Sequence, residues 1–102
     1  MTREIPKKPR RVSDEEVRET ILSMCREAGL NGVVRPEAVA REILPDHWQT
    51  LLKRIRLMSK QLAAAGLLAI LRKGEPADPK VVKGVIHLQI TEAGLIAEEE
   101  SA

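Results

Sequence analysis

The sequence predicts a small α+β domain that is mainly α-helical, with three helices followed by a small antiparallel β-hairpin. Two observations predict this class. Apolar residues recur with helical spacing in three segments between residues 13 and 66, and after Gly66 they alternate in short segments typical of strands. The 102 residues are enough for one hydrophobic core without a metal or a disulfide, so a single domain is expected.

The first helix is predicted to begin after Ser13 and to end at Gly29. The Ser13 hydroxyl can accept a hydrogen bond from a first-turn amide, and Glu16 completes an S-x-x-E capping pattern. Gly29 can end the helix with a positive φ. Helical spacing places five residues on one apolar face: Val17, Ile21, Met24, Cys25 and Ala28.

Two proline residues bound the second helix. Pro36 suits its first position, and Pro45 ends it. Before it, Val33 and Val34 predict a strand of two or three residues. After it, Asp46 is expected to cap the third helix, with Gln49 as its partner three residues later.

The third helix is the longest, from residue 47 to 65, and Gly66 is expected to stop it. Its apolar side comprises Trp48, Leu51, Leu52, Ile55, Met58, Ser59 and Leu62. A polar stripe with spacing i, i+4, i+7, i+11 faces away from this side and comprises Gln49, Lys53, Arg56 and Lys60. Arg54 lies on its flank, and Leu57 is an apolar residue that points outward.

Residues 67–72 and 85–90 predict two strands that pair antiparallel. Lys73-Gly74 forms a turn after the first, and an irregular loop with Pro76 and Pro79 connects the two. Thr91 is expected to cap one more helical turn, residues 92–97. The chain therefore divides into a flexible basic arm (1–12), a folded domain (13–97) and an acidic disordered tail (98–102).

Charge is distributed unevenly along the chain. Residues 1–12 carry five basic and one acidic side chain, and residues 47–73 carry six basic and no acidic ones. Residues 13–46 and 74–102 each have a net charge of −4, so the whole chain is only +2. A local surplus of positive charge on one helix and the following strand favours a polyanionic partner.

The order helix, short strand, helix, helix, strand, long loop, strand resembles the winged helix-turn-helix domain. The segment L-A-A-A-G-L-L (62–68) resembles the end of the third helix in such domains. More closely, the sequence resembles a small uncharacterised bacterial domain-of-unknown-function family over most of residues 20–90. The similar segments are P-E-A-V-A-R (36–41), P-D-x-W (45–48), I-R (55–56), L-A-x-x-G (62–66), R-K-G (72–74), D-P (78–79) and K-G-x-I-x-L (83–88).

This resemblance implies a winged-helix fold over residues 13–97 and assigns no activity. One feature departs from winged helices that read DNA: the segment from Asp46 to Gly66 is about one turn longer. Leu57 then falls at the end that would read the groove. Contacts to the DNA backbone are therefore favoured over sequence-specific base contacts.

The first functional hypothesis is binding of double-stranded DNA. Lys53, Arg56 and Lys60 would contact phosphates, and Gln49 or Arg54 would reach base edges. The loop would act as a wing through Arg72, Lys73, Lys80 and Lys83, and the arm would add Lys7, Lys8, Arg10 and Arg11. The alternatives are a solvated basic face and lysines that discourage edge-to-edge aggregation.

A second hypothesis, from another class, is a protein–protein interaction module without nucleic-acid binding. Leu57, Leu30 and Leu95 are its candidate apolar contacts. RNA is a third possible partner. Little of the chain remains for a dimerisation helix, so a monomer or weak dimer is expected.

Other functions find little support. Cys25 is a lone cysteine expected to be a buried thiol, and His47 and His87 have no spacing suited to zinc, so no metal and no cofactor are expected. No catalytic motif predicts an enzyme. Trp48 is the single aromatic residue, which counts against stacking of single-stranded bases. A cytoplasmic protein without membrane association is expected.

Overall fold

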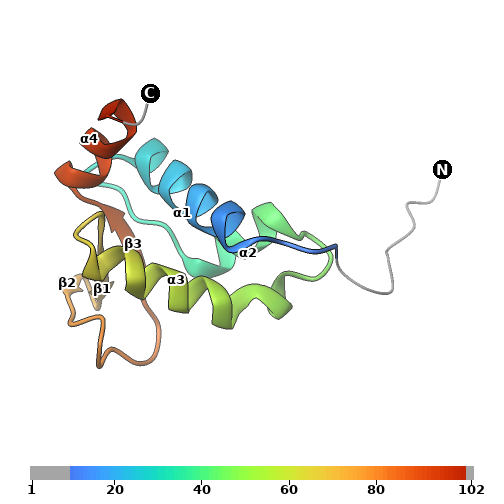
Figure 1. Cartoon of the computed structure of the whole chain (residues 1–102). Coiled ribbons are helices and arrows are strands. Elements are labelled where there is room, and N and C mark those ends of the chain that lie inside the picture. The colour runs from blue at the N-terminus through green and yellow to red at the C-terminus, as the bar shows by residue number, and fades with distance from the viewer. Residues whose placement is uncertain (1–9, 101–102) are drawn as a thin grey trace.

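The computed structural model describes the backbone of residues 10–100 and the side chains of residues 10–97. Four helices, a 3-10 turn and three strands follow one another along this part of the chain (Figure 1). They are α1 (Asp14–Ala28), α2 (Pro36–Ile43), η1 (Trp48–Leu51), α3 (Leu52–Ala64), β1 (Leu68–Arg72), β2 (Glu75–Pro76), β3 (His87–Ile90) and α4 (Glu92–Glu100). The predicted class, α+β with mainly helical content, is confirmed.

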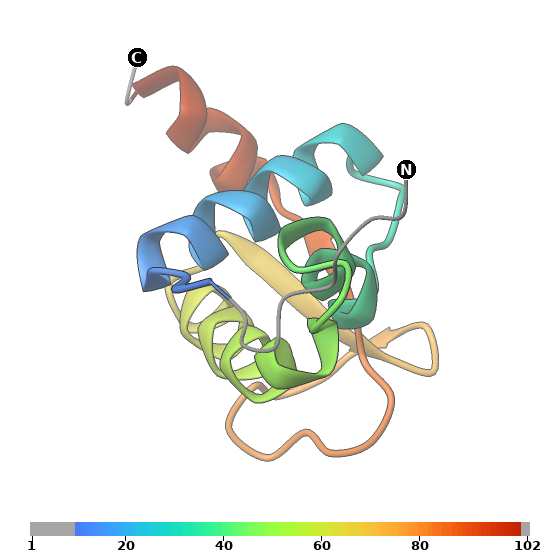
Figure 2. The same ribbon diagram turned by 90° about the vertical axis from the view of Figure 1, so that its right-hand side faces the viewer.

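The sheet is antiparallel, with the order β2-β1-β3. Helices α1, α2 and α3 pack against one another, and α1 and α3 also contact the sheet (Figures 1 and 2). The core between these layers consists of aliphatic side chains, among them Ile21, Ile55, Ile70 and Leu88. Among the described residues, the buried core contains no aromatic ring, and Trp48 packs only against its edge, so its packing depends mainly on aliphatic residues of α1, α2, η1, α3, β1 and β3.

Helix α1 begins and ends where the sequence predicts. The Ser13 hydroxyl accepts a hydrogen bond of 3.0 Å from the Glu16 amide. The reciprocal half of the capping box is replaced, because the Glu16 carboxylate accepts from Arg10 instead. Gly29 ends the helix with φ of 79°, and its amide donates to the Cys25 and Arg26 carbonyls.

The strand expected at Val33–Val34 is reduced to a single bridge. Only Val34 pairs, with Leu88 of β3, through hydrogen bonds of 2.8 and 2.7 Å. Val33 is exposed. Helix α2 follows with Pro36 in its first turn, as predicted.

The expected start of the third helix is wrong. The residue before η1 is His47, which makes no side-chain cap hydrogen bond, and Asp46 lies in the preceding turn. The His47 carbonyl accepts from both the amide and the hydroxyl of Thr50, which favours 3-10 winding. Packing holds this start, since Leu51 is buried and the Arg41 guanidinium lies 4.5 Å from the Trp48 ring centroid. The extra turn noted in the sequence is therefore η1.

The predicted β-hairpin is a three-stranded sheet instead. Glu75 and Pro76 form β2, which pairs with β1 across a two-residue turn at Lys73 and Gly74. Both turn residues have positive φ, which matches the twist of the flanking strands. Pro76 is tolerated because β2 is an edge strand. The remaining loop, residues 77–86, is anchored by the buried side chains of Val82 and Ile86.

Both ends of the domain extend further than expected. Val12 is 8% exposed and belongs to the core, so residues 10–12 of the expected arm pack against the domain. Thr91 caps α4 as predicted, accepting from the Gly94 amide at 3.1 Å, but the helix continues to Glu100 rather than ending at residue 97. Residues 1–9 and 101–102 lie outside the described residues. No helix in the described part is long and apolar enough to cross a membrane.

Candidate nucleic-acid interface

Helix α3 buries one apolar side and carries its basic side chains, together with Leu57, on the other sides. Its inward residues Ile55, Met58, Ser59 and Leu62 are buried, and the Ser59 hydroxyl donates to the Ile55 carbonyl at 2.7 Å. The buried hydroxyl therefore has its partner within the helix. Fixed in this way, α3 presents one constant face to solvent.

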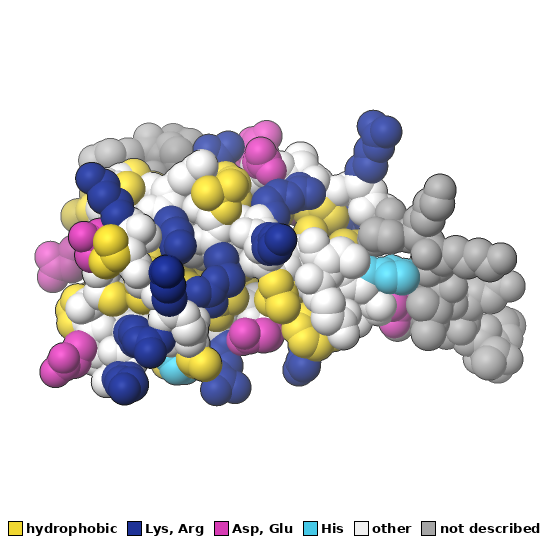
Figure 3. Space-filling view, turned by 90° about the horizontal axis from the view of Figure 1, so that it is seen from below, with side chains coloured by type: hydrophobic (Ala, Val, Ile, Leu, Met, Phe, Trp, Pro, Cys, Tyr) yellow, Lys and Arg dark blue, Asp and Glu magenta, His cyan; other side chains and the backbone are white. Residues whose placement is uncertain are grey.

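Helix α3 carries three cations that have no counterion among the described residues, exposed Lys53 and half-buried Arg56 and Lys60. Lys53, Arg56 and Lys60 make no ion pair or side-chain hydrogen bond with any other residue described by the structure. Lysine and arginine side chains gather over α3 and the adjoining turn and loop, with few carboxylates between them (Figure 3). These three residues, called the α3 face below, form the centre of the candidate interface.

Gln49 departs from this stripe. It is exposed, but it belongs to η1 rather than to α3. A 3-10 helix has about 3.0 residues per turn, so the spacing of four to Lys53 no longer brings the two side chains into line. The prediction that Gln49 continues the α3 face is wrong in this respect.

Arg54 does not belong to the α3 face either. Its guanidinium donates to the Val12 carbonyl and lies 3.6 Å from Asp14 Oδ1, and the side chain is 33% exposed. Arg54 therefore ties α3 to the start of α1. Its predicted role at base edges is not supported, because these contacts direct it along the side of the helix.

The predicted wing residues lie on the β1–β2 turn and the loop that follows. Lys73, Lys80 and Lys83 are exposed, and Arg72 donates to the Lys83 carbonyl. The loop runs beside α3 in both ribbon views (Figures 1 and 2). The Asp78 carboxylate accepts a hydrogen bond of 2.9 Å from the Lys80 amide and so stabilises the loop locally. The structure thus brings this turn and loop and the α3 face to the same side of the molecule (Figures 1 and 2).

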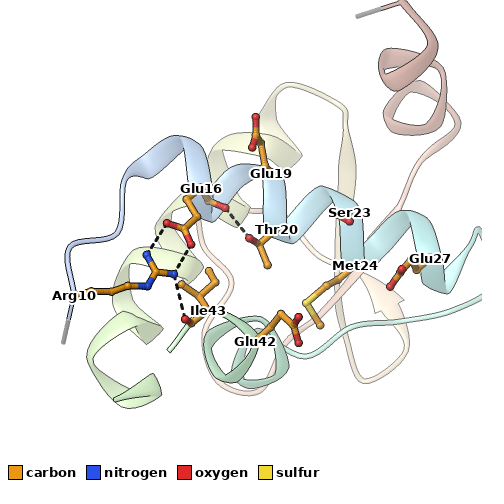
Figure 4. Close-up of a pocket in the computed structure, with 9 residues that line it drawn as sticks. All are labelled: Arg10, Glu16, Glu19, Thr20, Ser23, Met24, Glu27, Glu42 and Ile43. Atoms are coloured by element: carbon orange, nitrogen blue, oxygen red, sulfur yellow. Dashed lines mark hydrogen bonds and ion pairs between the residues drawn. The ribbon is translucent and has the colours of Figure 1, made fainter. Parts of the chain in front are cut away.

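Arg10, predicted as part of a DNA-binding arm, is engaged elsewhere. Two of its nitrogens donate to Glu16 at 3.0 and 2.6 Å, and a third contact of 3.4 Å reaches the Ile43 carbonyl (Figure 4). This hydrogen-bonded pair raises the pKa of Arg10 and lowers the pKa of Glu16. Arg11 is exposed, and Lys7 and Lys8 lie outside the described residues.

A groove between α1 and α2 was not foreseen. Its volume is about 580 Å³, and besides Arg10 and Glu16 it is lined by the carboxylates of Glu19, Glu27 and Glu42 (Figure 4). No residue of α3 belongs to its lining. The helical spacing of Glu16, Glu19 and Glu27 places them on one side of α1, which forms one wall of this groove. Glu42 belongs to the groove only because α2 packs against α1.

Several exposed apolar side chains accompany the basic residues. Leu57 on α3 is 55% exposed, and Val81 and Val85 in the loop are 70% and 66% exposed. Leu30 is exposed as expected, whereas Leu95 packs against the core and is not an available contact. Val81 and Val85 could not be identified as surface features from the sequence, because valine alone does not predict exposure in a loop.

The other reactive side chains lie in separate places. Cys25 is fully buried, and desolvation raises the pKa of its thiol to about 11, which keeps it protonated at neutral pH. Among the described residues, no group of three His, Cys, Asp or Glu is placed to hold a metal ion. His47 and His87 lie in different elements, before η1 and in β3.

Residues 14–91 match the model of a protein family described as a protein of unknown function (DUF3253). The match spans α1 through β3 and thus includes the α3 face, the wing and the core. No curated protein matches the sequence. Since the matched region covers most of the chain, this protein belongs to the DUF3253 family.

Proposed function

We propose that this chain is a non-catalytic winged-helix protein that binds double-stranded DNA through α3 and the wing. The topology supports the fold: Val34 pairs with β3, and β3 pairs with β1, around three helices. In this arrangement α2 and α3 form the helix-turn-helix. The β1–β2 turn and residues 77–86 form the wing.

The observation that carries the proposal is the uncompensated charge of the α3 face. Lys53, Arg56 and Lys60 project from one helix that is anchored to the core, within 27 consecutive residues (47–73) that contain no carboxylate. A helix fits the major groove of B-DNA, where such side chains reach phosphates on both of its rims. Binding releases counterions from DNA, which supplies most of the free energy.

Sequence preference is expected to be weak. Arg54 is held by Val12 and Asp14, and Leu57 occupies the middle of the outward side, where it can contact a thymine methyl group but offers no hydrogen bond. Phosphate contacts fix position without reading sequence. The proposed mode is therefore mainly backbone binding.

The test is titration of a labelled duplex at several salt concentrations. If the protein neutralises about four to six phosphates, log K falls with log salt at a slope of roughly −4 to −5. Two unrelated duplex sequences should bind with similar affinity, and an RNA duplex in the same assay separates the two nucleic acids. Absence of binding at ~50 mM salt and ~100 μM protein would refute the proposal.

A second candidate is a protein-interaction module, favoured by the exposed side chains of Leu57, Val81 and Val85. Apolar side chains among cations are also suited to a protein partner with an acidic, partly apolar surface. Affinity capture with and without nuclease distinguishes the two. Partners that remain bound after nuclease treatment support the second candidate, and loss of all partners supports the first.

A further inference from the structure

A small pocket opens at the base of the β1–β2 turn, next to the wing loop. Its volume is about 430 Å³, and it is lined by Arg72, Lys73, Gly84, Val85 and His87. Two of these side chains are cationic and one is an imidazole, whereas no carboxylate belongs to the lining. The pocket therefore concentrates positive charge in a concave site, unlike the convex α3 face.

Arg72 is positioned in advance of any ligand. It donates one N–H to the Lys83 carbonyl, which fixes the guanidinium against the loop. Gly84 makes this approach possible, since a Cβ there would collide with the guanidinium and φ is +85°. A guanidinium has five N–H donors, so four remain after this hydrogen bond. An arginine held in place loses less conformational entropy when it binds an anion.

Lys73 is an unusual choice for its position. Its φ is 55°, and it is the one residue other than glycine with positive φ among the described residues. Two-residue turns of this kind favour Asn, Asp or Gly at that position, because a larger side chain is less comfortable there. Strained backbone positions of this sort cluster at functional sites. A role for its ammonium group in the pocket would explain why a lysine occupies this turn position.

Val85 provides an apolar wall beside these cations. Its side chain is largely exposed in the absence of a ligand, and burying it would be favourable. Cations beside an apolar wall suit a phosphoryl group joined to a compact organic unit such as a sugar ring. Glu75 is the nearest acidic residue in the strand register, opposite Arg72, but it lies outside the lining.

We propose that this pocket is a binding site for one sugar-phosphate unit, with the phosphoryl group on Arg72 and Lys73 and the sugar against Val85. Two sources offer that chemistry: the backbone of a nucleic acid, and a free nucleotide or sugar phosphate. The site stands on its own geometry. When the source is the DNA backbone, it also rests on the proposed function.

The direct test is a titration of the full chain with thymidine 5′-monophosphate, followed by the amide NMR signals. Saturable shifts at Lys73, Gly84 and Val85 are expected, with smaller changes at α3. Inorganic phosphate should bind more weakly, and thymidine, which lacks the phosphoryl group, should not bind. Shifts that grow linearly and appear equally at Lys53, Arg56 and Lys60 would overturn the proposal.

Two variants sharpen the test. Lys73→Asn suits the turn better and should keep or raise the melting temperature, but it should weaken the mononucleotide by roughly three- to tenfold. Glu75→Gln removes a nearby negative charge and should strengthen binding of the mononucleotide. If Lys73→Asn leaves the mononucleotide affinity unchanged, the pocket does not hold a phosphoryl group through Lys73 and the proposal fails.

A duplex titration of the same variant identifies the source. If the backbone occupies the pocket, Lys73→Asn weakens duplex binding and reduces the salt slope by about one. If wild-type protein saturates with the mononucleotide but binds no duplex, the free sugar phosphate is the ligand. In that case the proposed function fails while the pocket stands.

Discussion

The α3 face and the α1–α2 groove are both rich in charge, yet they differ in sign and in how the charges are compensated. On α3, Lys53, Arg56 and Lys60 have no partner among the described residues. In the groove, Arg10 is bound to Glu16, and further carboxylates surround it. The net charge of the whole chain is small because the positive α3 face and the negative α1–α2 groove largely offset each other. A polyanion is attracted to the first side and repelled by the second.

The comparison depends on the core, which fixes α3 against α1 and the sheet, so the largest effect should come from a cavity there. Ile55 is fully buried in α3. Ile55→Ala should lower the free energy of unfolding by about 2–5 kcal/mol, because it removes buried methyl groups and leaves a cavity. Chemical denaturation measures the change. The exposed Leu57→Ala is the control and should change stability by less than about 0.5 kcal/mol.

Reversing the charge of the α3 face should remove the difference between the two charged sides and with it most of the binding of duplex DNA. Lys53→Glu with Lys60→Glu should weaken duplex binding by roughly 30- to 100-fold at low salt, since two phosphate contacts become repulsive. Arg18→Glu with Arg35→Glu is the matched control. It makes the same change in net charge at exposed positions of α1 and just before α2, and should cost less than about threefold. Equal losses in both variants would mean that net charge, not the α3 face, governs binding.

A substitution at Arg54 tests whether this residue belongs to the α3 face. Arg54→Met removes its hydrogen bond to Val12 and its proximity to Asp14, so stability should fall by about 0.5–1.5 kcal/mol. Duplex affinity should change by less than about twofold, because Arg54 does not project with Lys53. Thermal melting and the duplex titration measure the two quantities. A large loss of affinity with unchanged stability would return Arg54 to the interface.

The smallest effect concerns the Arg10–Glu16 pair at the edge of the groove. Hydrogen bonding to Arg10 lowers the pKa of Glu16 below its ordinary value of 4.5. Folding is therefore favoured above that value, and the contribution is lost as the pH falls through the lowered pKa. Wild-type protein and Glu16→Gln should differ in stability at pH 7, and the difference should shrink as the pH falls below the lowered pKa of Glu16. Denaturation curves across this range measure the difference, and a constant difference at all pH values would contradict it.

Much of the fold could be predicted from local patterns. The Ser13 cap, Pro36 at the start of α2 and Gly66 after α3 act within a few residues, so the sequence displays them directly. The apolar sides of α1, α3 and β3 follow from periodicity alone. The start of α3 was misjudged because the pattern of Asp46 and Gln49 is a common cap, whereas the packing of Leu51 and Trp48 prevails.

The candidate site was predicted in part for the same reason. Periodicity identified Lys53, Arg56 and Lys60 as one stripe, because all three lie in the regular helix. It could not distinguish Arg54 from them, since the partner of Arg54 lies 42 residues away at Val12. Nor could it show the pocket between Lys73 and Val85, which forms where the pairing of β3 with β1 brings residues 84–87 beside the end of β1.

The sequence by itself determined the class of fold, the helix limits set by local caps, and the concentration of positive charge between residues 47 and 73. Tertiary structure alone decided which of those charges remain without counterions and which side of the molecule collects the carboxylates. The physical reason is range. Helix periodicity and capping act over about four residues, whereas ion pairs, burial and strand pairing join residues that the chain brings together only when it folds.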